Sequence, residues 1–418
     1  MPLLSVLLPA VAIAVMVAFG LVGLFDMPVG WPSVSAAVHD QLLLAGPIAT
    51  MASYFYCSNL AGRRVLLALP TATRVGHVSV LRSFTLLLIW MLAAYLVPFI
   101  PLFVYMTATA SYGSIDVFAA LTGPVGMGLA VALGPVLGTA LPYPVLAPAA
   151  AVLVFLLFQL PNVAEPAAAA FVPTLGSPVR LGVVENPVLV AYRLVTMLVL
   201  TAFTLGLAGM LARRVRPNEL VSWRVGGALG AVVLLVSVPF ASPPRIVLAD
   251  DTSPQACRSV KGVDVCLHQG HRRMLDTAVP VVRALVEAYG SRPEYLTAAY
   301  GSSLPAPDAD TIAEFQPYTT APLKRAIASS VASHLAGIRS CSKALNSGRI
   351  RFHEYETRSA ERHALAIWLR QRAGLADERL PASAGEFLDG ANTARAVQAW
   401  LAAHGQQLAD CEPLQGAA

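Results

Sequence analysis

Lysine is nearly absent from this 418-residue chain, which has three lysines against 26 arginines. None of the three lies in residues 1–242, where ten arginines and six carboxylates are the only Asp, Glu, Lys and Arg side chains. So little charge leaves long uncharged runs, which are typical of membrane helices. The positive balance of this half follows from membrane topology, because nucleic-acid binding requires a clustered basic face on a soluble module.

The motifs of common ATPases and hydrolases are missing as well. The sequence contains no G-x-x-x-x-G-K-[ST] loop, so the chain does not hydrolyse ATP through a Walker motif. It has no G-x-S-x-G elbow and no papain-like cysteine context. His353-Glu354 is followed by Thr357 where a zinc protease needs its second histidine. We therefore expect a protein that is not an enzyme and binds no cofactor of its own.

Seven apolar stretches are long enough to cross a bilayer. They cover residues 3–25, 42–60, 84–106, 118–141, 143–160, 188–211 and 225–241. Arginines follow the second and the sixth stretch, and basic loops stay in the cytoplasm. This predicts a multi-pass protein with a cytoplasmic N-terminus and an extracytoplasmic C-terminal domain. The Arg-rich, Ala-rich composition suggests a bacterial plasma membrane.

Some features within these stretches predict how the helices pack. Gly134 and Gly138 form a small-xxx-small pattern, which lets two helices approach closely. The second stretch is polar enough to indicate burial against neighbouring helices. Arg193 lies about 10 Å inside the sixth stretch. It either contacts an anion, latches two helices together, or extends to the outer headgroups as a snorkelling side chain, which is the commoner case.

Residues 243–418 are predicted to form a mostly helical domain outside the cytoplasm. Helices are expected to begin near His268, Thr320, Glu354 and Asn392. Four cysteines suit the oxidising side of the membrane, and the short loop between the first two favours the pairs Cys257–Cys266 and Cys341–Cys411. No metal site is expected. His268 and His271 are weak candidates for ligands, with Glu356 or Asp264 as a third, and surface histidines are the commoner case.

Residues 1–215 resemble the permease subunits of ABC-2-type transporters, including the actinobacterial type that carries tails. The resemblance rests on six spans with both ends inside, a basic loop after the second span and a long external loop at residues 161–187. It implies that the loop from Ala61 to Arg82 holds a coupling helix that docks on a separate ATP-binding subunit. The docking residues would be Arg63, Arg64, Leu67, Leu69, Arg74 and Arg82.

The overall prediction is an all-α protein with three parts. These are a six-span permease bundle (1–215), a seventh span (216–242) and a helical, disulfide-tied domain (243–418). The expected function is transport energised by ATP hydrolysis on a partner subunit, with the permease as a homo- or heterodimer in the bilayer and without nucleic acid. The external domain would gate or recognise cargo or a partner. A membrane sensor or assembly subunit is the alternative, and a membrane-anchored hydrolase is a third possibility.

Overall fold

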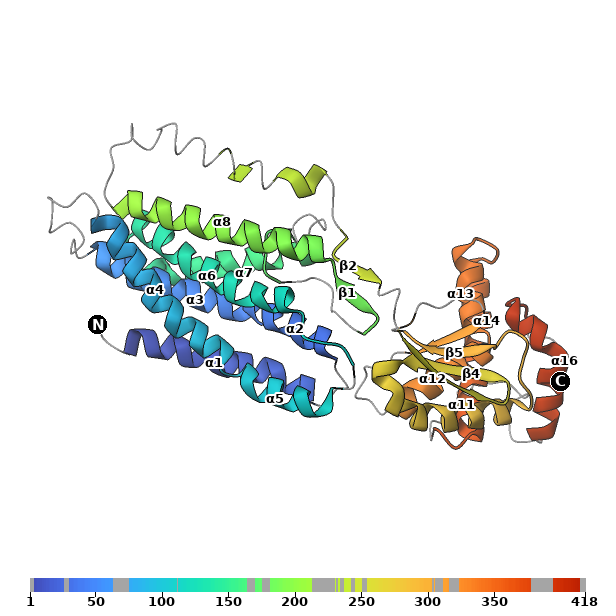
Figure 1. The fold of residues 1–418 in the computed structure, drawn as a ribbon. Coiled ribbons are helices and arrows are strands. Elements are labelled where there is room, and N and C mark those ends of the chain that lie inside the picture. The colour runs from blue at the N-terminus through green and yellow to red at the C-terminus, as the bar shows by residue number, and fades with distance from the viewer. Residues whose placement is uncertain are drawn as a thin grey trace. The chain divides into compact units, whose positions relative to one another are not determined.

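The computed structural model divides the chain into two units, Met1–Leu248 and Ala249–Ala418 (Figure 1). We call them the membrane unit and the distal unit. The structure describes residues 4–25, 30–62, 75–110, 112–163, 170–174, 181–212, 230, 232–233, 237–241, 245–249, 254–302, 304, 311–315, 323–376 and 394–413.

The membrane unit is built from helices. Their bounds are α1 Leu4–Phe25, α2 Trp31–Asp40, α3 Leu42–Gly62, α4 Val75–Leu96, α5 Phe99–Thr109, α6 Val117–Ala140, η2 Pro144–Leu146, α7 Ala147–Val163 and α8 Pro187–Ala212. A short strand, β1 (Val183–Glu185), pairs with β2 (Val247–Ala249). Four helical segments are long and apolar enough to cross a membrane: Val6–Phe25, Val78–Thr109, Val117–Ala140 and Pro187–Ala212. The chain is therefore a membrane protein.

The predicted stretches match most of these helices, with three differences. Helix α3 has the expected length, but its polar residues leave it outside the four apolar segments. Helix α7 is shorter than a full span. Helix α2 was not predicted, because its residues lie between the first two predicted spans and form no long apolar run. The seventh stretch lies largely outside the described residues, so the count of seven spans stays a prediction.

Helices α3 and α6 pack closely, as the glycine pattern predicts. A Cβ added at Gly134 would lie 2.5 Å from the Cβ of Ser53, and one at Gly138 would lie 2.8 Å from the carbonyl oxygen of Tyr54. Only glycine permits this distance between the helices. The Ser53 hydroxyl donates to the Val131 carbonyl at 2.8 Å. That carbonyl has no N–H from Pro135, four residues later, so α3 supplies the missing donor.

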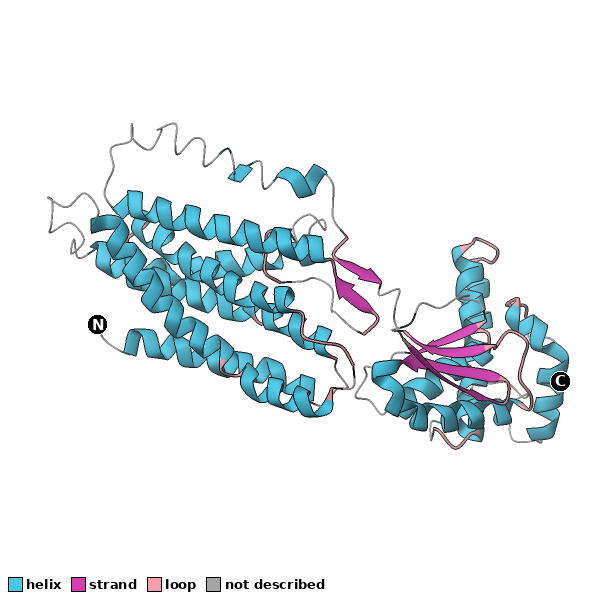
Figure 2. Cartoon of the chain, viewed as in Figure 1, coloured by secondary structure: helices cyan, strands magenta, loops and turns pink. Residues whose placement is uncertain are grey.

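The distal unit corrects the all-α prediction, because it contains a four-stranded mixed sheet (Figure 2). The strands are β3 Gln255–Val260, β4 Val263–His268, β5 Ala298–Gly301 and β6 Ile312–Phe315. Strands β3 and β4 are antiparallel, and β4, β5 and β6 are parallel. The turn between β3 and β4 is Lys261-Gly262, and both residues have positive φ. This suits a two-residue hairpin, which we had not predicted because its strands are short and β3 is mostly exposed.

Helices form most of the distal unit and enclose its core. They are η4 Gln269–Met274, α11 Leu275–Tyr289, α12 Leu323–Leu335, α13 Ile338–Asn346, α14 Phe352–Arg372 and α16 Ala394–Ala409. Helix α11 contacts β3 and β4, α12 contacts β6, and α14 packs on α11 and α12. Apolar side chains of these elements make one buried cluster. Gly290 ends α11 with φ of 107°, as expected for a helix stop.

Two disulfides and one buried arginine hold the distal unit together. The pairs Cys257–Cys266 and Cys341–Cys411 are confirmed, with Cα–Cα distances of 4.1 and 4.9 Å. The first links directly opposed residues of β3 and β4. The second links α13 to the segment after α16. Arg362 is fully buried in α14 and donates to the Gln407 and Glu412 carbonyls at 3.2 and 2.8 Å, so it fastens the same C-terminal segment.

Candidate functional site

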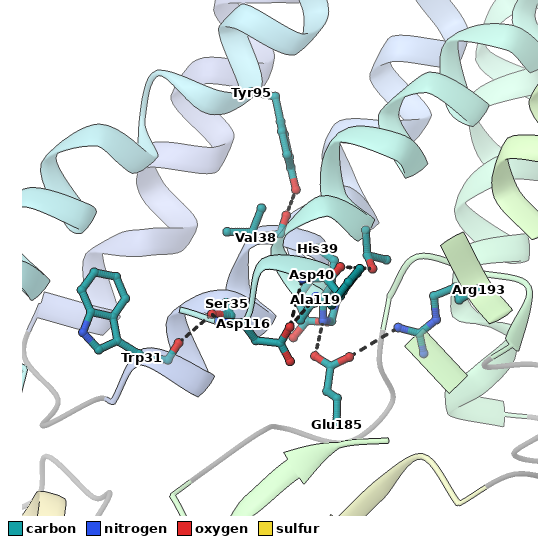
Figure 3. Close-up of polar contacts among 12 residues, drawn as sticks. Trp31, Ser35, Val38, His39, Asp40, Tyr95, Asp116, Ala119, Glu185 and Arg193 are labelled. Atoms are coloured by element: carbon teal, nitrogen blue, oxygen red, sulfur yellow. Dashed lines mark hydrogen bonds and ion pairs between the residues drawn. The ribbon is translucent and has the colours of Figure 1, made fainter. Parts of the chain in front are cut away.

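The candidate site lies where α2 meets α4, α6 and the segment before α8 (Figure 3). Helix α2 is short, and residues Val34 to His39 are all buried. The Ser35 hydroxyl donates to the Trp31 carbonyl at 2.9 Å and accepts from the Asp116 N–H at 3.0 Å. The Tyr95 hydroxyl of α4 donates to the Val38 carbonyl in the last turn of α2. Two of these bonds satisfy backbone groups that would otherwise have no partner: the Asp116 N–H in a loop and the Val38 carbonyl at the end of α2.

Asp116 extends this arrangement into α6. Its side chain caps the helix by accepting from the Phe118 and Ala119 N–H groups, both at 3.0 Å. Gly123, farther along α6, allows close approach to α2, because an added Cβ would lie 2.6 Å from the Val38 carbonyl oxygen. The C-terminal end of α2 is therefore held by both α4 and α6.

His39 lies between two carboxylates at the end of α2. Its Nε2 is 2.7 Å from Glu185 Oε1, and its Nδ1 is 3.1 Å from Asp40 Oδ1. The His39 side chain is 0% exposed and that of Glu185 is 3% exposed, whereas that of Asp40 is 37% exposed. An ionised carboxylate only accepts hydrogen bonds, and both ring nitrogens lie within ion-pair distance of a carboxylate, which favours the doubly protonated ring.

Arg193 completes the arrangement from the second turn of α8. Its Nη1 is 3.8 Å from Glu185 Oε2, and its side chain is fully buried. Glu185 thus lies between His39 and Arg193, and Figure 3 shows both cations directed toward its carboxylate. We call His39, Asp40, Glu185 and Arg193 the buried charge network. With the imidazole protonated it contains two cations and two anions, the balance that buried charges require.

Two opposing effects set the pKa of His39, which lies outside the four spanning segments. Burial lowers the pKa of the imidazole, while hydrogen bonding to Asp40 and Glu185 and the charges of both carboxylates raise it. The carboxylates prevail, and the pKa is raised above 6.5. A proton on His39 can pass to the buried Glu185 at 2.7 Å, and the half-exposed Asp40 links the ring to the surface. The network can therefore work as a charged latch or as a short proton path.

The loop before α8 supports this geometry. Asn186 directly follows Glu185 and caps α8, because its side chain accepts from the Val188 N–H at 3.1 Å. The same side chain donates to the Arg245 carbonyl at 3.0 Å, and its backbone N–H donates to the Ile246 carbonyl at 3.1 Å. Glu185 is thus fixed from both sides, by β1 pairing and by the start of α8.

The predicted site residues fall into separate parts of the structure. Arg193 is in the buried charge network and is enclosed by protein, so the snorkelling interpretation is wrong and the latch interpretation has a partner in Glu185. Of the docking loop, Arg63, Arg64, Leu67, Leu69 and Arg74 lie outside the described residues. Arg82 is exposed on α4.

The two histidine candidates are not surface residues. His268 ends β4 and His271 lies in η4, and both are at most 1% exposed. The Nδ1 atom of His268 accepts from the Gly270 N–H at 3.1 Å, so His268 caps this turn. Within the part of the chain that the structure describes, no three His, Cys, Asp or Glu side chains are grouped to hold a metal ion.

Sequence reasoning missed His39, Asp40 and Glu185. A signal was available, since residues 1–242 contain only six carboxylates, and two of them, Asp40 and Asp116, each come two residues before a predicted span. What the pattern could not provide was the pairing across 146 positions between His39 and Glu185.

Together, the apolar helices and the buried charge network define a multi-helix membrane protein with a second, disulfide-linked unit. Comparison of the chain with protein-family models, with curated proteins and with solved structures gave no match.

Proposed function

We propose that this protein is a permease-like membrane subunit of an ABC-type transport system, energised by a separate ATP-hydrolysing subunit. The observation that carries the proposal is the buried charge network inside a many-helix unit. A single helix is enough to anchor a soluble domain. Ionisable side chains enclosed among apolar helices are costly and mark substrate or ion paths and contacts that change during function.

The network joins two segments that lead into long helices. His39 and Asp40 end α2, and one residue separates α2 from α3. Glu185 likewise lies one residue away from the start of α8, with Asn186 between them. Because α6 packs on both α3 and α8, a change at the network would be transmitted to the closely packed centre of the bundle. We assign the network the role of a latch that holds α2 and the start of α8 together in one state of a transport cycle and releases them in another.

The first test identifies the energy source. Full-length protein with an affinity tag, solubilised in mild detergent, should co-purify with a subunit that contains a Walker-A motif. The paired changes Leu67→Asp and Leu69→Asp should abolish this co-purification, because charge removes the apolar anchor of the docking loop. The paired changes Arg63→Gln and Arg64→Gln should weaken it less, because charges at the rim mainly orient the partner.

Membrane insertion of each variant, measured as protein in the washed membrane fraction, is the control. Co-purification of the ATPase with the Leu67→Asp, Leu69→Asp variant at the wild-type level would contradict the docking assignment. Recovery of a kinase or a sigma-factor regulator in place of an ATPase would favour a sensor subunit instead.

The second test concerns orientation. We propose that the distal unit is extracytoplasmic, on the basis of its two disulfides and the arginines before residue 225. An enzyme reporter fused after Ala418 should be active only if it works outside the cytoplasm. Activity of a strictly cytoplasmic reporter at that position would overturn the orientation.

A further inference from the structure

A cavity of about 260 Å³ lies in the distal unit beside α13. Its walls come from the segments before β5 and β6, from the end of α12, from α13 and the turn after it, and from the end of α16 with the residue that follows. The lining residues are Tyr295, Thr311, His334, Arg339, Ser340, Lys343, Arg349, Ala409 and Asp410. None of these residues belongs to the buried charge network or to the predicted docking loop.

Positive charge dominates the lining of this cavity. Arg339 and Lys343 are one helical turn apart on α13, and Arg349 follows in the turn after the helix. Asp410 is the one carboxylate among the lining residues, so the lining has a net charge of +2. Outside the lining, Glu314 forms an ion pair with Arg339, with its Oε2 3.9 Å from Arg339 Nη2. That separation leaves the guanidinium free to hold a second anion, because Arg presents five donors.

The walls of the cavity are fixed before any ligand binds. The Tyr295 hydroxyl donates to the Leu335 carbonyl at 2.7 Å, and His334 Nε2 donates to the Tyr295 carbonyl at 3.1 Å. Arg339 Nη1 donates to the Ile312 carbonyl at 3.2 Å. The disulfide Cys341–Cys411 joins α13 to the segment that carries Asp410. A site whose side chains are already ordered loses less entropy on binding.

His334 contributes polarity without charge. Burial lowers its pKa, the Tyr295 carbonyl partly offsets this, and the charge of Arg339 lowers it further, so the net shift is downward from 6.5. The ring is therefore neutral at pH 7. Since Nε2 donates to a carbonyl, Nδ1 is the acceptor nitrogen of the neutral ring. A ligand hydroxyl is the kind of donor that suits it.

We propose that this cavity binds a ligand that carries a phosphate group. A phosphate monoester has a charge of about −1.5 to −2 at pH 7, which matches the net charge of the lining. Arginine and lysine together are the side chains that bind phosphate in proteins, arginine through its fork and lysine as a point charge. This proposal goes beyond the proposed function and does not rest on it, because binding here requires neither an ATPase partner nor transport.

The test uses the full chain in detergent, with chloride replaced by inorganic phosphate at constant ionic strength. Isothermal titration should detect binding by the wild type. The paired changes Lys343→Gln and Arg349→Gln should weaken binding at least tenfold, and Arg349 is exposed, so its loss leaves the fold intact. The matched control carries Arg258→Gln and Lys261→Gln, two exposed cations in surface ion pairs elsewhere in the distal unit. It has the same net charge and should bind as the wild type does.

A variant that binds phosphate more tightly than the wild type cannot be explained by misfolding, because misfolding would weaken binding. Asp410 is exposed and its Oδ2 accepts only from Gln406 among the described contacts, at 2.9 Å. The change Asp410→Asn should tighten phosphate binding severalfold, because it removes the one carboxylate of the lining. Titration with a short-chain phosphatidylglycerol below its micelle concentration distinguishes the source of the phosphate. Tighter binding of this diester than of inorganic phosphate would point to a lipid headgroup, and the reverse order to a free phosphate.

The proposal is overturned if the wild type binds neither compound. It is also overturned if the cavity variant and the control variant bind phosphate equally well, because the attraction would then be a general effect of net charge.

Discussion

The two units of this protein differ in what they expose, although each has a buried apolar cluster. In the membrane unit the surface is apolar, with Phe19 82% and Val145 81% exposed, while Thr50, Ser53 and Arg193 are buried. In the distal unit the buried cluster is apolar. Among the residues described in this unit, Phe352 is the one large apolar side chain that is exposed. The difference follows from the solvent, since lipid removes the hydrophobic drive that packs a soluble core.

The two units also differ in what joins their elements. In the distal unit an apolar core is reinforced by two disulfides and by the buried guanidinium of Arg362. The membrane unit also has a buried apolar cluster, and its helices are joined further by glycine contacts, hydroxyl-to-carbonyl bonds and one charge network. This comparison predicts that small and polar residues contribute most to the stability of the membrane unit. In the distal unit, disulfides and apolar burial should contribute most. Substitutions in both units test this prediction.

The C-terminal disulfide should have the largest effect. Replacing Cys341 and Cys411 with alanine opens a loop of 70 residues and should lower the free energy of unfolding of the distal unit by about 4 kcal/mol. The same change at Cys257 and Cys266, which are nine residues apart, should cost about 3 kcal/mol. Pulse proteolysis of the full chain measures both. An equal or reversed order would show that loop length does not govern these cross-links.

Arg362 should come next. Replacing it with methionine keeps the volume but leaves the Gln407 and Glu412 carbonyls without their buried donor, so we expect a loss of about 3 kcal/mol. Arg372→Met, at an exposed position on the same helix, is the control and should change stability by less than about 0.5 kcal/mol. Burial lowers the pKa of Arg362 to about 10, so the side chain stays charged at pH 7. If the two variants are equally stable, Arg362 does not stabilise the distal unit in this way.

The glycine contact in the membrane unit provides a matched pair on one helix. Gly134→Ala places a Cβ 2.5 Å from the Cβ of Ser53, and we expect it to destabilise the bundle by about 2 kcal/mol through overpacking. A Cβ at Gly128 meets nothing within 4 Å, so Gly128→Ala should be neutral or stabilise α6 by up to about 1 kcal/mol. Thermal unfolding in detergent compares them. If both variants behave alike, close packing of α3 on α6 is not what holds this unit together.

The smallest expected effect is a change in pH dependence. Because the folded pKa of His39 is raised above 6.5, its contribution to stability is fully present below pH 6.5 and is lost as the pH rises through the folded pKa. His39→Gln should remove this decline while leaving the rest of the profile unchanged. Thermal unfolding in detergent between pH 6 and pH 9 measures it. A wild-type stability that rises over this window relative to the variant would contradict the assigned direction.

These comparisons also explain what the sequence could and could not predict. Long apolar runs predicted α1, α6 and α8 closely, because a bilayer demands an uncharged helix of a set length. Cysteine spacing predicted both disulfides correctly. The strands of the distal unit were missed, since four to six residues of mixed burial leave little periodicity.

The buried charge network shows why a site is harder to predict than a span. Arg193 was noticed because a charge inside an apolar run is conspicuous. Its partner ends a short strand eight residues earlier, and His39 lies in a short helix that the sequence did not predict. Each residue is ordinary in its local context, and only the folded chain brings the two segments together.

We propose that the buried charge network belongs to the working part of an ATP-driven membrane subunit. The most direct measurement is ATP turnover by the co-purified complex in lipid nanodiscs, for the wild type, Glu185→Gln and Asp116→Asn. The first change leaves two buried cations with less opposing charge, and the second removes an exposed carboxylate while asparagine still caps α6. We predict that Glu185→Gln alters ATP turnover at least fivefold with the partner still bound, and that Asp116→Asn does not. Equal turnover in all three proteins would contradict the claim.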